Sequence, residues 1–341
     1  MKRICFLFAL FPFILSAQYQ KMAGVNFVSA QHEAQVESGI PPLKRIAANY
    51  ICINPFAVME NNNDPQISYN IPINWWGDRP ENIAVVVKDA RKNNIKIMLK
   101  PHFWVKGTGW AGQLDFTEEN WDKWEVNYTE FVLKMAKIAE EHHMDSFCFG
   151  VELKSAVRER PDFFIQLIPK IRAIYHGKLL YASNWDDYQT IPFWDLLDYI
   201  GIDAYFPISE SITPSVDEIR VMWQEIALQM KELAYKYKKQ VIFTEFGYRS
   251  IDRAVWKQWV IESVPQDQQM NMQAQVNGYE GFFEALWDEV WVAGGFLWKW
   301  YPEDSEYGGL DDSDYTPQHK PAEKTIYDWY SKIYHFTPKK K

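Results

Sequence analysis

Two glutamates, Glu152 and Glu245, are the residues of this sequence best placed to do chemistry. Each comes at the end of an apolar run, at 147–155 (FCFGVELKS) and 241–250 (VIFTEFGYRS), which is typical of a buried strand followed by a loop. A carboxylate at the end of a dry strand is costly unless another group pairs with it or uses it. We therefore predict that the two carboxyl groups face each other across a pocket, an arrangement that can hydrolyse glycosidic bonds.

The elements that would position this pair follow a strand-then-helix alternation along the chain. Apolar runs that fit strands lie at 23–29, 50–58, 95–105, 146–154, 179–186, 199–207, 241–249 and 292–301. Helical periodicity is clear at 81–93, 119–143, 161–175, 215–238, 271–290 and 320–335, with shorter helices fitting at 41–49 and 190–197. Eight such units predict an α/β fold, a single-domain (β/α)8 TIM barrel, with its site at the C-terminal ends of the strands. The doubly wound alternative lacks a glycine-rich phosphate loop after the first strand.

Alternate side chains of a strand share a face, so residues in phase with the glutamates should reach the same end of the barrel. These residues are Lys100, His102 and Trp104 in the third strand, Asp203 and Tyr205 in the sixth, and Trp298 in the eighth. Asn184 and Trp185 end the fifth strand, and the sequence does not decide which of them faces inward. Flat rings beside hydrogen-bonding groups suit sugars, which have C–H faces and polar rims. Taken singly, Lys100 or His102 would fit a structural role; their common phase with Trp104 favours the site, whereas both readings stay open for Asp203.

Composition and charge narrow the class of partner. The chain has 341 residues, 16 of them Trp, and a net charge of −9, with no basic stripe apart from the final lysines. Phosphate backbones would be repelled, so we predict a neutral substrate and no nucleic acid. The sequence has no GxSxG, HExxH, Walker A or CxxC motif, and the acidic stretch at 311–314 lacks EF-hand spacing. We therefore expect no metal or cofactor, and a monomer.

The first residues, MKRICFLFALFPFILSAQ, combine a basic start, an apolar segment at 4–15 and small residues near Ala17. This pattern predicts a signal peptide at 1–17, a catalytic domain at 18–341, and a secreted or periplasmic protein that does not stay in the membrane. Cys52 and Cys148 remain after cleavage, and both lie in apolar runs, which favours buried free thiols over a disulfide or a metal site.

Five motifs in order give the chain a resemblance to a known family. They are GVNF in the first strand, LKPHFW in the third, GVELKS in the fourth, TEFGYRS in the seventh and GGFLWKWYP in the eighth. The chain resembles the retaining glycoside hydrolases of clan A over roughly 22–335, and within them glycoside hydrolase family 113, whose known members are β-1,4-mannanases. The resemblance implies that Glu152 is the acid/base, Glu245 the nucleophile, Tyr205 a hydrogen-bond donor to it, and Trp298 the floor of the −1 sugar. Many clan members have Asn before the acid/base where this chain has Val151, so Lys100, His102 or Asn184 could take over its contact with the sugar 2-OH.

The resemblance therefore implies a retaining endo-β-1,4-mannanase acting on a neutral β-linked polysaccharide or oligosaccharide. Two alternatives stay open: a clan A hydrolase of another β-glycan or of short β-mannosides, and a catalytically silent carbohydrate-binding barrel. Tryptophans in the predicted loops could extend the cleft or simply pack on helices; they are Trp75, Trp76, Trp110, Trp256 and Trp259. The long loops at 59–80 and 250–270 could wall an open groove, for endo action, or close one end, for exo action.

Overall fold

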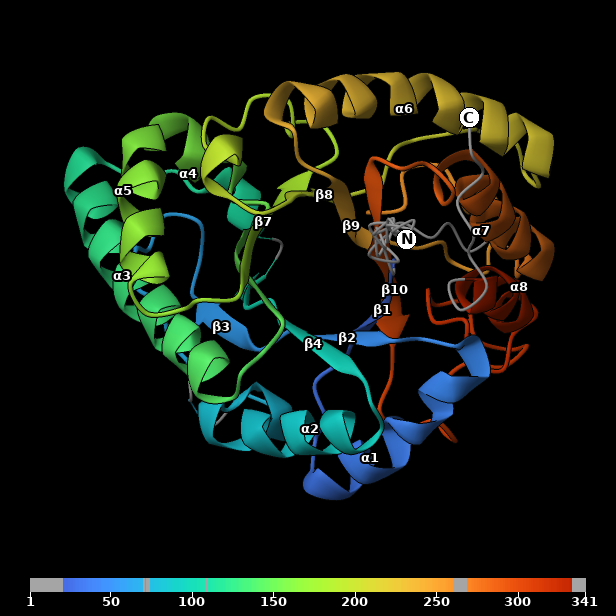
Figure 1. Ribbon diagram of the computed structural model, residues 1–341, viewed down its shortest axis with the longest axis horizontal. Helices are drawn as coiled ribbons and strands as arrows, with labels where there is room; N and C mark the ends of the chain where they lie inside the picture. Colours follow the sequence, from blue (N-terminus) through green and yellow to red (C-terminus); the bar gives the residue numbers. More distant parts are fainter. Residues whose placement is uncertain (1–20, 70, 72–73, 108, 261–268, 333–341) are drawn as a thin grey trace, which may run out of the picture.

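The protein is a closed barrel of parallel strands surrounded by helices (Figure 1). The computed structural model describes residues 21–69, 71, 74–107, 109–260 and 269–332. Around the barrel the strands are hydrogen-bonded in the order β1-β10-β9-β8-β7-β6-β4-β2. Their bounds are β1 (Met22–Phe27), β2 (Tyr50–Ile53), β4 (Lys96–Leu99), β6 (Ser146–Val151), β7 (Lys178–Asn184), β8 (Ile200–Asp203), β9 (Val241–Phe246) and β10 (Val292–Trp300). The predicted TIM barrel, with its single domain, is confirmed.

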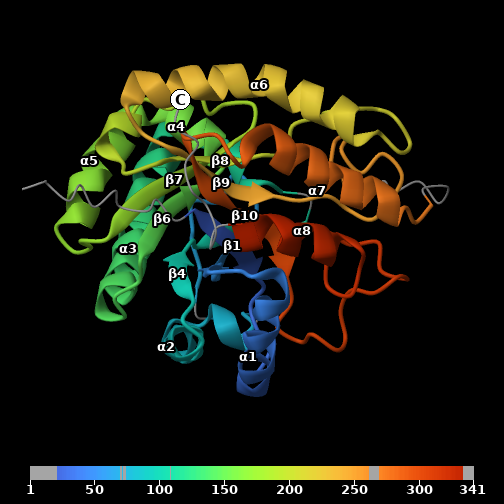
Figure 2. The same ribbon diagram turned by 45° about the vertical axis from the view of Figure 1, so that its right-hand side comes forward.

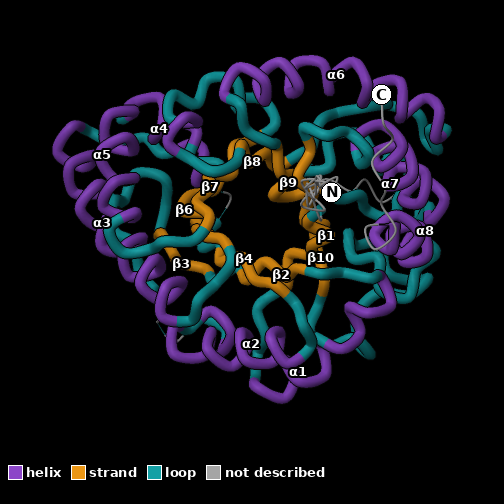
Figure 3. Tube along the Cα trace, viewed as in Figure 1, coloured by secondary structure: helices purple, strands orange, loops and turns teal. Residues whose placement is uncertain are grey.

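The helices form an outer ring around these strands (Figures 2 and 3). They are α1 (Glu33–Gly39), α2 (Pro80–Lys92), α3 (Glu118–Glu141), α4 (Lys154–Glu159), α5 (Pro161–Arg172), α6 (Val216–Tyr237), α7 (Met272–Leu286) and α8 (Ala322–Tyr330). Short 3-10 turns are η1 (Pro41–Ile46), η2 (Trp76–Asp78), η3 (Ala111–Gln113) and η4 (Trp194–Leu196). The two longest helices begin at side-chain caps, since Thr117 accepts from the Asn120 N–H and Ser215 from the Glu218 N–H.

The six long helices that were predicted are present, although the end of the one at 320–335 lies outside the described residues. The short helix predicted at 41–49 is the 3-10 segment η1, and the prediction of a helix at 190–197 is wrong. That segment is mostly turns and contains only the single 3-10 turn η4. The Trp194 indole donates to the carbonyl of Tyr188, just before the segment, and this contact stabilises the turns. The short helices α1 and α4 were not predicted, since neither is long enough for a helical period to stand out from the flanking sequence.

The core has two layers, one inside the barrel and one between strands and helices. Cys52, Met98 and Cys148 belong to the inner cluster, and both cysteines are buried free thiols, as predicted. The outer cluster is larger and holds most of the buried aromatic rings. Strands covered on both faces explain why the sequence shows unbroken apolar runs rather than alternation.

Two predicted strands are each broken in two by a proline. The run 50–58 divides into β2 and β3 (Phe56–Met59), and the run 95–105 into β4 and β5 (His102–Val105). β3 and β5 pair with each other in a separate two-stranded parallel sheet. Pro55 and Pro101 stand at the two breaks, where a residue without an N–H cannot continue the ladder. This departure of β5 from the barrel decides where His102 and Trp104 lie.

None of the helices in the described part of the chain is both long and apolar enough to cross a membrane. The predicted signal peptide at 1–17 lies outside the described residues.

Candidate active site

Glu245 is buried near the end of β9 and is held by two donors. The Lys100 ammonium donates to its Oε1 at 2.6 Å, and the Tyr205 hydroxyl donates to its Oε2 at 2.8 Å. Burial alone lowers the pKa of Lys100, but the charges of Glu245 and Asp203 outweigh it and the pKa rises above its ordinary value. Burial and the adjacent carboxylate also raise the pKa of Tyr205, so the phenol keeps its proton. Both donors therefore stabilise a negative charge on Glu245.

His102 lies beside the same carboxylate, with Nε2 at 3.5 Å from Glu245 Oε1. Burial, together with the Lys100 charge, lowers the pKa of His102 well below its ordinary value. The imidazole is therefore neutral, and its buried Nε2 has no hydrogen-bond partner among the described residues. A neutral ring with a free nitrogen beside the carboxylate is suited to a sugar hydroxyl.

Glu152 follows directly after β6 and begins the turn into α4. Its N–H donates to the Ala182 carbonyl of the neighbouring β7, and its φ of +51° places it in the left-handed region. A non-glycine residue there stores of order 1 kcal/mol of strain, which the surrounding structure must hold. Backbone strain of this kind is common at active sites and ligand-binding residues.

The environment of the Glu152 carboxyl group opposes ionisation. Burial, followed by the negative charge of Glu245, raises its pKa to about 8, whereas the Trp110 hydrogen bond and the Lys100 charge act in the other direction. The Trp110 indole donates to Glu152 Oε2 at 2.9 Å. The structure thus brings together two carboxyl groups with different environments: Glu152 holds a proton at neutral pH, and Glu245 is paired with a cation.

Asp203 is buried at the end of β8, in the wall of the barrel. The Thr244 hydroxyl donates to its Oδ1 at 2.7 Å, and its Oδ2 has no partner among the described residues. Burial and the charge of Glu245 raise the pKa of Asp203 well above its ordinary value. Its hydrogen bond to Thr244 within the barrel wall fits the structural role, one of the two roles that the sequence left open.

Asn184 and Trp185 lie at the end of β7, on the side of the barrel next to β6. Asn184 is tied to its own loop, because Oδ1 accepts from the Trp185 N–H and Nδ2 donates to Asp186. Asp186 also pairs with Lys154, which follows Glu152 in α4. The Trp185 ring stacks on Trp259 with centroids 5.3 Å apart and planes 24° apart, and 42% of Trp259 is exposed.

Trp298 lies on β10, which pairs with the strand β9 that carries Glu245. Its ring centroid is 5.9 Å from that of His102 and 5.8 Å from the Lys100 ammonium. Trp298, His102 and Lys100 thus form one wall around the Glu245 carboxylate, as their phase predicted.

Trp104 lies beyond the break at Pro101 that divides the predicted third strand into β4 and β5. It lies on β5, outside the barrel, opposite Val58 of β3 and 46% exposed. Trp104 is in phase with His102, because both residues belong to β5, and its contact with substrate stays a prediction. Lys100 and His102 still reach Glu245 because they lie immediately on either side of the break.

Trp110 is the site residue that sequence reasoning did not single out. It was one of several loop tryptophans, and no period relates a loop residue to a strand end. The only local signal is its place between Gly109 and Gly112, which permits close packing of the loop.

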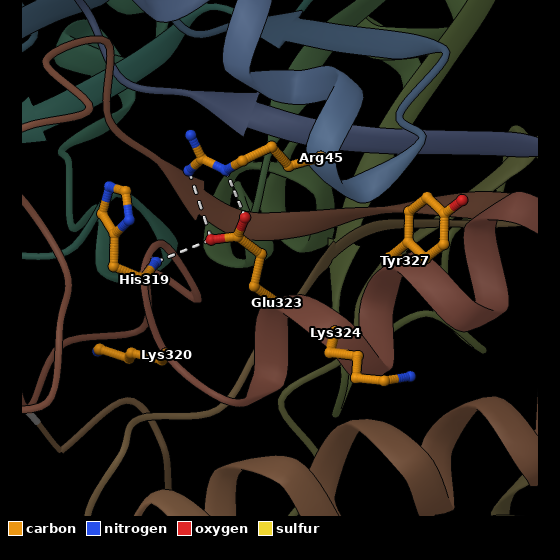
Figure 4. Close-up of a pocket in the computed structure, with 6 residues that line it drawn as sticks. All are labelled: Arg45, His319, Lys320, Glu323, Lys324 and Tyr327. Atoms are coloured by element: carbon orange, nitrogen blue, oxygen red, sulfur yellow. Dashed lines mark hydrogen bonds and ion pairs between the residues drawn. The ribbon is translucent and has the colours of Figure 1, made fainter.

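A separate surface hollow of about 540 Å³ lies between η1 and α8 (Figure 4). Its lining residues are Arg45, His319, Lys320, Glu323, Lys324 and Tyr327. Arg45 pairs with Glu323 and with Asp304, so the strongest charges of the hollow are already satisfied. Neither Glu152 nor Glu245 lines it.

The described residues contain no group of three or more His, Cys, Asp or Glu side chains that could hold a metal ion. In the acidic stretch at 311–314, Asp312 accepts from the Gly308 N–H and Asp314 from the Tyr301 hydroxyl. These aspartates shape the loop after β10.

A parallel barrel with a carboxyl pair at the C-terminal ends of its strands defines a TIM-barrel glycoside hydrolase. Within this class the chain belongs to Glycoside Hydrolase Family 113, whose model matches residues 26–332. The resemblance inferred from the five sequence motifs is therefore confirmed.

Solved structures agree with this assignment. The chain is similar to the GH113 β-mannanase of Alicyclobacillus acidocaldarius, solved in complex with ManMIm, with 25% identity and a TM-score of 0.80 over 92% of this chain and 98% of that one. A GH113 β-1,4-mannanase solved as a complex shares the fold at 22% identity, with a TM-score of 0.79 over 92% and 99% of the two chains. A β-glucuronidase from Ruminococcus gnavus shares the barrel more distantly, at 14% identity and a TM-score of 0.61 over 92% of this chain and 50% of that one. No curated protein matches the chain in sequence.

Proposed function

We propose that this chain is a secreted, retaining endo-β-1,4-mannanase that acts as a monomer on mannan or glucomannan. The observation that supports the proposal most strongly is the difference in electrostatic environment between the carboxyl groups of Glu152 and Glu245. Glu245 is paired with the Lys100 ammonium, whereas burial and the Glu245 charge raise the pKa of Glu152 to about 8. Double displacement needs this difference, with one carboxylate ionised to attack and one carboxylic acid protonated to donate.

In the first step, a Glu245 oxygen bonds to the anomeric carbon while the glycosidic C–O bond breaks. The proton of Glu152 passes to the leaving oxygen, so no charged alkoxide forms. In the second step, Glu152 accepts a proton from water as the water oxygen bonds to the anomeric carbon. The ester bond to Glu245 breaks as this new bond forms, and both carboxyl groups return to their starting states.

The wall around Glu245 would hold the sugar that reacts. The Trp298 ring supplies a face for the C–H side of the sugar, and the free Nε2 of His102 supplies a polar partner. Because Val151 replaces the Asn common in the clan, His102 is our candidate for the contact with the 2-OH. Lys100 and Asn184 are already engaged, with Glu245 and Asp186 respectively.

A mannan substrate is supported by the similar structures, which are of β-mannanases. Endo action is supported by the exposed Trp185–Trp259 stack, because a polymer extends beyond the reacting sugar and can lie on further rings. Secretion rests on the predicted signal peptide at 1–17. The alternative of another β-glycan keeps the same barrel and carboxyl pair and differs only in the sugar contacts.

The test is reducing-sugar release from glucomannan, galactomannan, xylan, carboxymethylcellulose and mixed-linkage glucan. We expect mannan-selective activity in the wild type, and a loss of at least about 10³-fold in Glu152→Gln and Glu245→Gln. Glu141→Gln, a change on the exposed face of α3, is the matched control and should keep full activity. Activity on another glycan would move the substrate but keep the two acids. Tight sugar binding with no turnover in the wild type would instead favour a silent binding barrel.

A further inference from the structure

A tryptophan outside the barrel strands touches the acid/base directly. The Trp110 indole N–H donates to Glu152 Oε2 at 2.9 Å, and within the described part of the chain this is the only hydrogen bond to that carboxyl group. An indole nitrogen is a donor only and cannot exchange roles as the reaction proceeds. The bond can therefore persist in both the protonated and the ionised state of Glu152.

The bond distinguishes the two oxygens of the carboxyl group. In a carboxylic acid the carbonyl oxygen accepts hydrogen bonds better than the hydroxyl oxygen. Because Trp110 donates to Oε2, the proton of the neutral acid resides on Oε1. We propose that Trp110 is a positioning residue that makes Glu152 Oε1 the oxygen that gives its proton to the leaving group and later takes one from water. This inference rests on the proposed function.

The loop that carries Trp110 is built to hold the ring in one place. The Trp110 carbonyl accepts from Asn62 Nδ2 at 2.6 Å, and the Asn62 carbonyl accepts from the Asp115 N–H at 3.0 Å. The indole also packs on the backbone of Gly112, where an added Cβ would lie 2.4 to 2.6 Å from three ring atoms. These contacts fix the indole before any substrate arrives.

Four ionisable groups act on the Glu152 carboxyl group from the surrounding elements. Glu245 on β9, Asp187 after β7 and Asp203 on β8 raise the cost of a negative charge there, whereas Lys100 after β4 lowers it. The Trp110 hydrogen bond also lowers the pKa of Glu152. Its removal should therefore move the acid further from ionisation and at the same time free the carboxyl group to rotate.

The discriminating experiment compares two substrates with Trp110→Phe. An unactivated mannotetraose needs a proton on its leaving oxygen, whereas 2,4-dinitrophenyl β-mannobioside does not, because its leaving group is already stable as an anion. We expect kcat/KM to fall at least about 10-fold on mannotetraose and less than about 3-fold on the aryl substrate. We also expect the alkaline limb of the pH profile to rise by about 0.5–1 unit, as the loss of one hydrogen bond implies.

The matched control is Trp329→Phe on α8, which removes an indole hydrogen bond of 3.1 Å to Glu280, outside the site. It should show neither the selective loss nor the shifted limb. Equal losses of Trp110→Phe on both substrates, or an unmoved alkaline limb, would overturn the proposal. If Trp110→Phe does not fold, Asn62→Ala serves in its place. It must then show a smaller selective loss on mannotetraose and a smaller shift of the alkaline limb.

Failure of this inference differs from failure of the proposed function. Glu152→Gln should lose mannotetraose activity but keep much of its first-step rate on the aryl substrate. If it does so while Trp110→Phe behaves like the wild type, the acid/base stands and the positioning role falls. If Glu152→Gln retains full mannotetraose activity, both fall together.

Discussion

At the scale of the residue, the proposed chemistry depends on one buried cation. Lys100 is fully buried and donates to Glu245 at 2.6 Å. Its positive charge therefore balances a negative charge on the Glu245 carboxylate at the end of a buried strand. A buried pair of this kind is a poor source of stability, since both groups lose their water. Its value is that Glu245 lies against a cation, whereas burial and the Glu245 charge raise the pKa of Glu152 in the same site. We therefore propose that Lys100 and Glu245 are a functional pair.

The raised pKa of Glu152 predicts a cost in stability. The pKa is about 8 in the folded protein against an ordinary value of 4.5, so above pH 4.5 the unfolded chain loses a proton that the folded chain keeps. Wild-type stability should consequently fall as the pH rises from about 4.5 to 8, by up to about 1.4 kcal/mol per unit. Glu152→Gln cannot ionise and should escape this loss. Because the residue is partly accessible to water, we expect a gain of about 1–3 kcal/mol at pH 8 and little at pH 4.5.

Denaturant unfolding of both proteins across this pH range measures the effect. Glu141→Gln on the surface of α3 again serves as the control and should follow the wild type. A constant difference between Glu152→Gln and the wild type at every pH would contradict the raised pKa.

At the scale of the element, the pairing of neighbouring strands predicts which side of the site binds the leaving group and which side binds the reacting sugar. β7 pairs with β6, which ends at the proposed acid, so the loop after β7 lies on the side where the leaving group must stand. β10 pairs with β9, which carries Glu245, and brings Trp298 to the side where we propose that the reacting sugar binds. The Trp185–Trp259 stack should therefore bind sugars of the leaving group.

Removal of the exposed ring of that stack tests this placement. We expect Trp259→Ala to raise KM for mannohexaose by about 5–30-fold, which corresponds to about 1–2 kcal/mol of lost ring contact, and to change mannobiosides with an aryl leaving group less than twofold. Initial-rate kinetics on the two substrates measure the difference. Trp329→Phe controls for the loss of a tryptophan elsewhere, and an equal effect on both substrates would contradict the assignment.

The elements also explain how far the sequence could go. The places of Glu152 and Glu245 at strand ends could be predicted because a polar residue that ends an apolar run has few structural reasons to be there. Tyr205 and Trp298 followed from the two-residue period. The period did not show the break at Pro101 that places Trp104 on β5 rather than in the barrel, and Trp110 was not chosen because loop residues obey no period. Contacts made by loops depend on tertiary packing, which one sequence does not display.

At the scale of the whole molecule, barrel closure is what makes the site. Glu152 and Glu245 are far apart in sequence, and only the ring of strands brings their carboxyl groups into one electrostatic unit. The two core layers keep the strand ends in fixed register, so each side chain enters the site at a defined place. The net charge of −9 is compatible with a neutral polysaccharide, which is neither attracted nor repelled by it.

The most direct test of the account is to trap the glycosyl-enzyme. A 2-deoxy-2-fluoro-β-mannosyl fluoride slows the second step more than the first, so the covalent ester accumulates. Peptide mass spectrometry after incubation should find a single added fluorosugar, on the peptide that contains Glu245. An adduct on Glu152, or full activity on mannan with no adduct at any reagent concentration, would contradict the proposed double displacement.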